Sequence, residues 1–167
     1  MRARTRPLAG ETDLGPLVSE AVRAGLHRQV TRAVADGARV LTGGELPSGA
    51  GFFYPATILA DLPETSAVRR EELFGPVAIL LRARDRDDAL KLANETPFGL
   101  GSSIWTDDQD EAAFFNRTIE AGMTFVNTAV ASDPHLPFGG VKRSGFGREF
   151  GVYGLREFTN IKTVVTA

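Results

Sequence analysis

The chain contains no cysteine among its 167 residues. This absence excludes disulfides, thiolate-bound zinc, iron–sulfur clusters and a cysteine nucleophile within these residues. A large charge of one sign is also missing, since the formal net charge is −2. No electrostatic footprint for nucleic acid follows from such a balance. No apolar run approaches the roughly 20 residues of a membrane span, and the N-terminus has no apolar stretch typical of a secretory signal. We therefore expect a cytoplasmic protein without nucleic-acid or membrane partners.

What is present is ordinary for a folded protein. Apolar residues make up 43% of the chain and charged residues 24%. This balance argues against a disordered chain. The length fits one domain or a piece of one, and it is sufficient for a hydrophobic core.

The N-terminal half is predicted to contain one helix and one strand. Apolar residues spaced by four indicate one face of a helix over 18–36, namely Val18, Val22, Leu26, Val30 and Val34. Ser19 or Pro16 can begin this helix and Gly37 can end it. Residues 43–51 are rich in Gly, Pro and Ser and predict a surface loop. The aromatic and aliphatic residues 52–59 predict a strand.

The middle of the chain alternates strand and helix patterns. In chain order these are strand 77–81, helix 86–93, strand 100–105, a helix ended by Gly122, and strand 123–126. The continuous apolar run at 77–81 is typical of a strand buried on both faces. Asp85 is expected to cap the first helix, and Asp107 or Asp108 the second. The alternation predicts βαβ units in a parallel sheet.

A long glycine-rich loop, a weak helix and a strand are predicted to complete the chain. The loop covers residues 127–147, the helix 148–157, and the β-branched tail 161–166 predicts the strand. The loop is not a Walker loop, because Phe146 stands where the phosphate-binding lysine belongs. A dinucleotide fingerprint is also absent. The glycines therefore favour a folded-back loop over a phosphate site.

Few titratable residues stand out as candidates. His27 is predicted to be a solvated surface residue, and His135 is a conceivable general base with no partner evident in the sequence. Glu71 and Glu72 are adjacent, so an extended backbone points them to opposite sides. One of them is then a solvated charge. The other can face a ligand at the mouth of the parallel strand that follows.

Five segments, taken together, resemble the C-terminal part of the aldehyde dehydrogenase superfamily. They are Thr12-Asp-Leu-Gly-Pro-Leu17, Glu71-Glu-Leu-Phe-Gly-Pro76, Asn94-Glu-Thr-Pro-Phe-Gly-Leu100, Glu120-Ala-Gly-Met-Thr-Phe-Val-Asn127 and Pro137-Phe-Gly-Gly-Val-Lys-Arg-Ser-Gly145. The resemblance covers nearly the whole chain after about residue 12. The stretch Ala131-Ser-Asp133, with Phe138-Gly-Gly-Val-Lys142, looks most like the succinate-semialdehyde dehydrogenase branch.

The resemblance implies NAD- or NADP-dependent oxidation of an aldehyde to a carboxylate. It implies that Glu72 accepts hydrogen bonds from the nicotinamide ribose and that Phe74 packs beside this ribose. It further implies that Phe138 lines the aldehyde tunnel and that Ser132 touches a substrate carboxylate. A carboxylate suits two hydroxyl donors, and an aromatic wall excludes water.

The resemblance also implies an α/β fold, the parallel-sheet catalytic-domain portion of the aldehyde dehydrogenase fold with a C-terminal oligomerisation strand. The expected divisions are an N-terminal arm (1–15), a partial catalytic domain (16–157) and the oligomerisation strand (158–167). The family's Rossmann domain and cysteine nucleophile lie before the part that this chain resembles. We therefore expect the isolated chain to be inactive, and to pair with a missing N-terminal half or with further copies of itself. The alternative is a non-catalytic remnant that acts as a subunit-interaction module.

Overall fold

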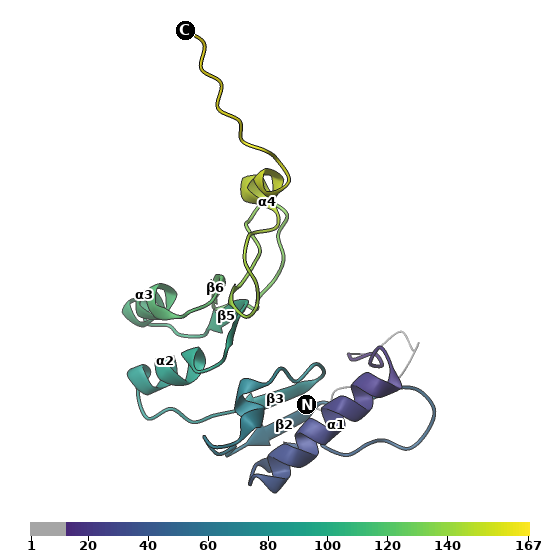
Figure 1. The fold of residues 1–167 in the computed structure, drawn as a ribbon. Helices are drawn as coiled ribbons and strands as arrows, with labels where there is room; N and C mark the ends of the chain where they lie inside the picture. The colour runs from purple at the N-terminus through teal and green to yellow at the C-terminus, as the bar shows by residue number, and fades with distance from the viewer. Residues whose placement is uncertain (1–12) are drawn as a thin grey trace. The chain divides into compact units, whose positions relative to one another are not determined.

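The computed structural model describes residues 13–167 (Figure 1). The chain divides into two compact units, Met1–Ala83 and Arg84–Ala167. Most of the predicted N-terminal arm lies outside the described residues. No helix formed by residues 13–167 combines the length and the apolar character that a bilayer span requires, and a cytoplasmic location stays a prediction.

The first unit packs one helix against a three-stranded sheet. Its elements are α1 (Glu20–Ala35), β1 (Arg39–Thr42), β2 (Thr57–Ala60), the 3-10 helix η1 (Ala67–Arg70) and β3 (Val77–Leu80). The strand order is β1-β2-β3, with β1 antiparallel and β3 parallel to β2. The core includes Leu26 and Val30 of α1, Leu59 of β2, and Val68 of η1.

The predicted helix is confirmed, but its buried face is different. Ser19 is the N-cap, and its side chain accepts a hydrogen bond from the backbone N–H of Val22. The buried residues of α1 are Leu26, Val30 and Ala33, whereas Val18 and Val34 are exposed. The true helical period of 3.6 residues makes a strict four-residue stripe drift around the helix, so its ends leave the core.

Two predictions for the first unit's strands are wrong in detail. The strand begins at Thr57 rather than at residue 52, and Pro55 just before it has no N–H to donate to a ladder. Strand β3 is not buried on both faces, because Ala78 and Leu80 are exposed. Its continuous apolar sequence therefore presents one face that residues of this unit do not cover.

The second unit contains three helices and two two-stranded sheets. Its elements are α2 (Arg86–Asn94), β4 (Phe98–Gly99), β5 (Gly101–Ile104), α3 (Gln109–Thr118), β6 (Met123–Val126), β7 (Val141–Lys142) and α4 (Gly151–Glu157). Strand β5 pairs with β6 in parallel across α3, as predicted. Strand β4 pairs with β7 in antiparallel fashion. Strand β7 lies inside the segment 127–147, which was predicted to be a loop.

The predicted helix caps of the second unit are confirmed. The predicted end of its second helix and the predicted common parallel sheet are wrong. Asp85 accepts from the N–H of Asp88, and Asp108 accepts from two backbone N–H groups at the start of α3. Helix α3 ends at Thr118, before Gly122. Strand β3 belongs to the sheet of β1 and β2, whereas β5 and β6 form a separate two-stranded sheet. The fold is thus mixed α/β with small sheets.

Residues 84–167, all of which are described, bury few side chains. Ile104 is their only apolar side chain in the fully buried core. The tail 158–167 forms no helix or strand, so the strand predicted at 161–166 is absent from this chain. A strand needs a hydrogen-bonded neighbour, and none pairs with the tail among the described residues.

Candidate functional site

The segment Glu71–Pro76 presents two side chains outward and holds two inward. Glu71 and Leu73 are partly buried, and Leu73 packs against the core of the first unit. Glu72 and Phe74 are exposed, and Phe74 retains 67% of its accessible surface. At Glu71 the backbone is extended, with φ −101° and ψ 153°, and in such a backbone successive side chains point to opposite sides. It separates the two adjacent glutamates into one inward and one outward carboxylate.

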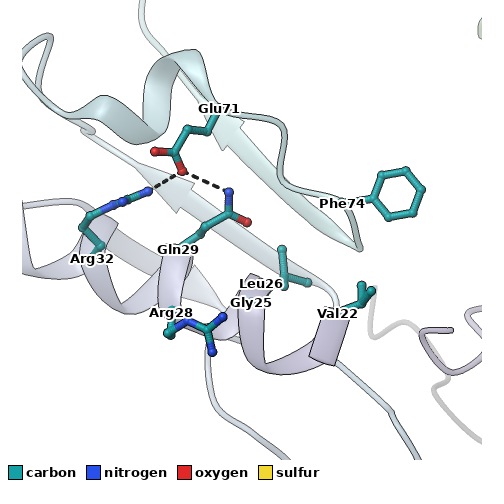
Figure 2. A pocket seen from close by; sticks show the side chains of 8 residues that line it. All are labelled: Val22, Gly25, Leu26, Arg28, Gln29, Arg32, Glu71 and Phe74. Atoms are coloured by element: carbon teal, nitrogen blue, oxygen red, sulfur yellow. Dashed lines mark hydrogen bonds and ion pairs between the residues drawn. The ribbon is translucent and has the colours of Figure 1, made fainter. Parts of the chain in front are cut away.

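The inward carboxylate is held by α1. Gln29 Nε2 donates to Glu71 Oε2 at 3.0 Å, and Arg32 forms an ion pair with the same carboxylate. Figure 2 shows Glu71 reaching towards these two side chains, while Phe74 points away from them. Glu71 is therefore neither a solvated charge nor a free acceptor.

The outward carboxylate is available to a ligand. Within residues 13–167, the Glu72 side chain has no hydrogen bond or ion pair. The neighbouring Phe74 ring offers an exposed aromatic face two residues along. A carboxylate with all its lone pairs free can accept from two hydroxyl groups, and the ring can pack against a sugar or a heteroaromatic group. These groups fit the ribose and nicotinamide of a nicotinamide cofactor.

A pocket of about 720 Å³ lies between α1 and this segment. Its lining includes Gln29, Arg32, Glu71 and Phe74 (Figure 2). Arg28 adds a second guanidinium to the lining. The pocket thus combines an apolar wall with cationic donors.

The other two predicted site residues belong to the second unit. Ser132 is exposed and makes no hydrogen bond within the described part of the chain. Phe138 is half-buried and forms a two-way backbone bridge with Glu149, with N–O distances of 2.8 and 2.6 Å. Its ring packs edge-to-face on Phe150 at 6.0 Å between centroids. Phe138 is therefore held in place, whereas Ser132 is not.

The Lys142 side chain and close backbone packing hold the base of the loop that carries Phe138. Lys142 Nζ donates to the carbonyl oxygens of Asn94 and Thr96 and forms an ion pair with Glu120 at 2.6 Å. Gly122 lies so close to Gly139 that a Cβ on Gly122 would stand 1.8 Å from the Gly139 carbonyl oxygen. The glycines of this region thus permit close packing of backbone on backbone, as the folded-back loop requires.

Both histidines have partners that the sequence did not reveal. His135 Nδ1 lies 2.9 Å from Asp133 Oδ1, and hydrogen bonds from His135 lower the pKa of Asp133. His27 is half-buried, with Nδ1 at 3.2 Å from the hydroxyl of Tyr54, so its prediction as a solvated residue is wrong. Burial raises the pKa of Tyr54 to about 12. Residues 13–167 gather no group of three His, Cys, Asp or Glu side chains that could hold a metal.

Comparison with known proteins decides the family. The aldehyde dehydrogenase family model matches residues 3–164. The chain belongs to the aldehyde dehydrogenase family. It is 49% identical to an aldehyde dehydrogenase of Paenarthrobacter nicotinovorans, over 96% of this chain and 35% of the relative. It is 48% identical to a succinate-semialdehyde dehydrogenase (NADP+) of Mycobacterium leprae, over 95% of this chain and 35% of the relative.

A solved aldehyde dehydrogenase structure agrees. The succinic semialdehyde dehydrogenase from Streptococcus pyogenes in complex with NADP+ matches with a TM-score of 0.90 and 36% identity, over 95% of this chain and 35% of that one. The resemblance stated from the five sequence segments is thereby confirmed. The chain spans about a third of the length of the relatives that it matches.

No pattern in the sequence points to the residues that support the site. Gln29 and Arg32 are three positions apart on α1, which is a spacing that places them on one helix face. Their partner Glu71 is about forty residues away in the chain. The helix pattern could show that they are neighbours, but nothing in the sequence could show which carboxylate they contact.

Proposed function

We propose that this chain forms the C-terminal part of an NAD(P)-dependent aldehyde dehydrogenase that oxidises succinate semialdehyde or a similar aldehyde to the carboxylate. The observation that carries the proposal is the exposed pair Glu72 and Phe74 beside an inward-held Glu71. Family membership and the named succinate-semialdehyde dehydrogenase relatives support it.

Glu72 and Phe74 are proposed to bind the nicotinamide end of NAD or NADP. The Glu72 carboxylate accepts hydrogen bonds from the two ribose hydroxyls and thereby fixes the sugar. Phe74 covers one side of the ribose and excludes water from it. A bound NAD or NADP would supply the hydride acceptor that the oxidation of an aldehyde requires. The two side chains contribute orientation, which favours that transfer geometrically.

Phe138 and Ser132 are proposed to contact the substrate. The Phe138 ring, held by its bridge to Glu149 and by Phe150, forms an apolar wall for the aldehyde's carbon chain. The free Ser132 hydroxyl donates a hydrogen bond to the distal carboxylate of a semialdehyde. This serine distinguishes a substrate with a second carboxylate from a plain aliphatic aldehyde.

Complete turnover is proposed to require a further polypeptide segment. Family members use a cysteine thiolate to form a covalent bond to the carbonyl carbon, and these 167 residues contain no cysteine. The proposed partners are an N-terminal aldehyde dehydrogenase half and further copies of this chain. The tail 158–167 is proposed as the oligomerisation strand, paired with a strand of another subunit.

A chimera tests this function directly. Residues 3–164 replace the matching C-terminal part of the Paenarthrobacter nicotinovorans relative, and NADH or NADPH formation is followed at 340 nm with succinate semialdehyde and with hexanal. We expect turnover, with a preference for succinate semialdehyde that falls in Ser132→Ala. A folded, oligomeric chimera that forms no reduced cofactor would contradict the proposal.

Glu72→Gln in the same chimera tests the cofactor role. The loss of charge-assisted hydrogen bonds, worth about 1.5–3 kcal/mol, should weaken cofactor binding by roughly 10- to 100-fold. Glu95→Gln is the control, because it makes the same change of side chain elsewhere in the chain. Equal cofactor affinity in Glu72→Gln and the parent would refute the assignment.

The alternative function is a subunit-interaction module without catalysis. It is favoured by the apolar pocket of about 840 Å³ in the second unit, whose lining includes Phe150, Leu155 and Phe158. Of these, Phe158 is 94% exposed. A chimera that assembles normally yet binds no cofactor would favour this function over the enzymatic one.

A further inference from the structure

We infer that Gln29 is a positioning residue for the cofactor site, acting through the backbone of the Glu71–Pro76 segment. The inference rests on the proposed function of Glu72 and Phe74. It concerns a side chain of α1 that would not itself touch the cofactor.

Gln29 contacts two consecutive residues of the segment with one amide group. Its Nε2 donates to Glu71 Oε2 at 3.0 Å and to the backbone carbonyl oxygen of Glu72 at 3.1 Å. An amide NH2 has two hydrogens, so both bonds can form together. Within residues 13–167, the Arg32 side chain bonds to the Glu71 carboxylate and not to the Glu72 peptide. Gln29 is thus the side chain of α1 that holds both the inward carboxylate and the peptide unit that carries Glu72.

The rest of the segment is held by other means on either side. Leu73 packs against the core, and Gly75 lies against Leu26, where a Cβ would stand 2.4 Å from Leu26 Cδ2. The carbonyl oxygen of Pro76 accepts from the N–H of Thr57 at 2.9 Å. Glu72 lies between η1 and these contacts. There the hydrogen bonds from Gln29 fix the rotation of the backbone.

This rotation decides which way the Glu72 carboxylate points. Turning the Glu72 peptide turns the Glu72 side chain with it, whereas Phe74 is held separately by the turn in which the Gly75 N–H donates to Leu73 O at 2.8 Å. The core contacts of Leu73 and Gly75 alone would still fold the segment onto the unit. Loss of Gln29 should therefore weaken cofactor binding without unfolding the protein.

Gln29→Met tests the inference, because methionine keeps the length and the helix propensity of glutamine and removes both donors. Gln109→Met is the matched control, since Gln109 is exposed at the start of α3. In the 167-residue chain, hydrogen exchange of the amides of residues 71–75 should accelerate in Gln29→Met, while the amides of α1 and β2 stay protected. Unchanged exchange at 71–75 would overturn the inference whatever the cofactor does.

In the chimera, cofactor dissociation constants from NADPH fluorescence give the functional readout. We expect about tenfold weaker binding in Gln29→Met, from the loss of two hydrogen bonds, and no change in Gln109→Met. In a Glu72→Gln background, Gln29→Met should raise the cofactor dissociation constant by less than about twofold, since the effects of coupled residues are not additive. Full additivity would show that Gln29 acts independently of Glu72 and would refute positioning. A parent chimera that binds no cofactor would overturn the proposed function and this role together, whereas a binding parent with an unaffected Gln29→Met would overturn only this inference.

Discussion

Gly122→Ala should destabilise the second unit because there is no space for a methyl group. A Cβ at Gly122 would lie 1.8 Å from the carbonyl oxygen of Gly139 and 2.9 Å from Cα of Gly140. Both neighbours are backbone, so no side-chain rotation can relieve the contact. Gly122 also donates its N–H to Gly99 O at 3.0 Å.

The size of the effect follows from the displacement that the methyl group requires. Real Cβ atoms essentially never approach within 3.0 Å, so the two backbones must separate by about 1.2 Å at this point. Overpacking of this kind costs about 1–3 kcal/mol. A displacement that large also weakens the Gly122–Gly99 hydrogen bond, which adds about 1 kcal/mol. We expect a loss of about 2–4 kcal/mol of unfolding free energy, or a fall in Tm of roughly 5–15 °C for a chain of this length.

Thermal melting followed by circular dichroism, with urea titration, measures this loss. Gly15→Ala is the matched control, because a Cβ at Gly15 meets nothing within 4 Å. The control should melt with the parent or slightly above it, since alanine restricts the unfolded chain. The expected fall in Tm is at least roughly 5 °C. A Gly122→Ala protein that melts within about 1 °C of Gly15→Ala would therefore refute the backbone-contact reasoning.

Three further predictions follow from burial, composition and the tail. Burial raises the pKa of Tyr54 to about 12 from 10.0, so in Tyr153→Phe the single phenol should ionise near pH 12 when folded and near 10 in urea. Because the neutral phenol is favoured in the folded state, stability should fall as the pH rises between these values; an absorbance titration at 295 nm with one midpoint in both states would contradict this. The isolated chain should form no NADH or NADPH from semialdehydes, since it has no thiol; turnover in protein purified by two independent routes would disprove it. Truncation after Asn160 removes Ile161, Val164 and Val165, each more than 70% exposed, and should shift the parent's assemblies towards smaller species in light scattering; an unchanged mass distribution would argue against strand addition by the tail.

The local signals in the sequence were sufficient for helices and family. Ser19, Asp85 and Asp108 were identifiable as caps because an N-cap depends on neighbours two or three residues away. The parallel pairing of β5 with β6 also followed from the strand–helix–strand order. The five family segments were confirmed by a family match over residues 3–164. They pointed to Glu72, Phe74, Ser132 and Phe138 as site candidates, and these roles stay predictions.

The family resemblance implies a role for Glu72, but only the tertiary structure shows physically which of the two adjacent glutamates is free. Glu71 and Glu72 are chemically identical neighbours, and alternation along the backbone predicts only that they point to opposite sides. The contacts of Gln29 and Arg32 with Glu71 assign the inward role to it and leave Glu72 exposed.

The same limit explains β3, whose apolar sequence could not reveal that Ala78 and Leu80 lie exposed in this chain. It also explains the tail, whose β-branched residues favour a strand but cannot form one without a neighbouring strand. Capping and periodicity depend on residues close in the chain, whereas burial and pairing depend on residues that only folding or assembly brings together.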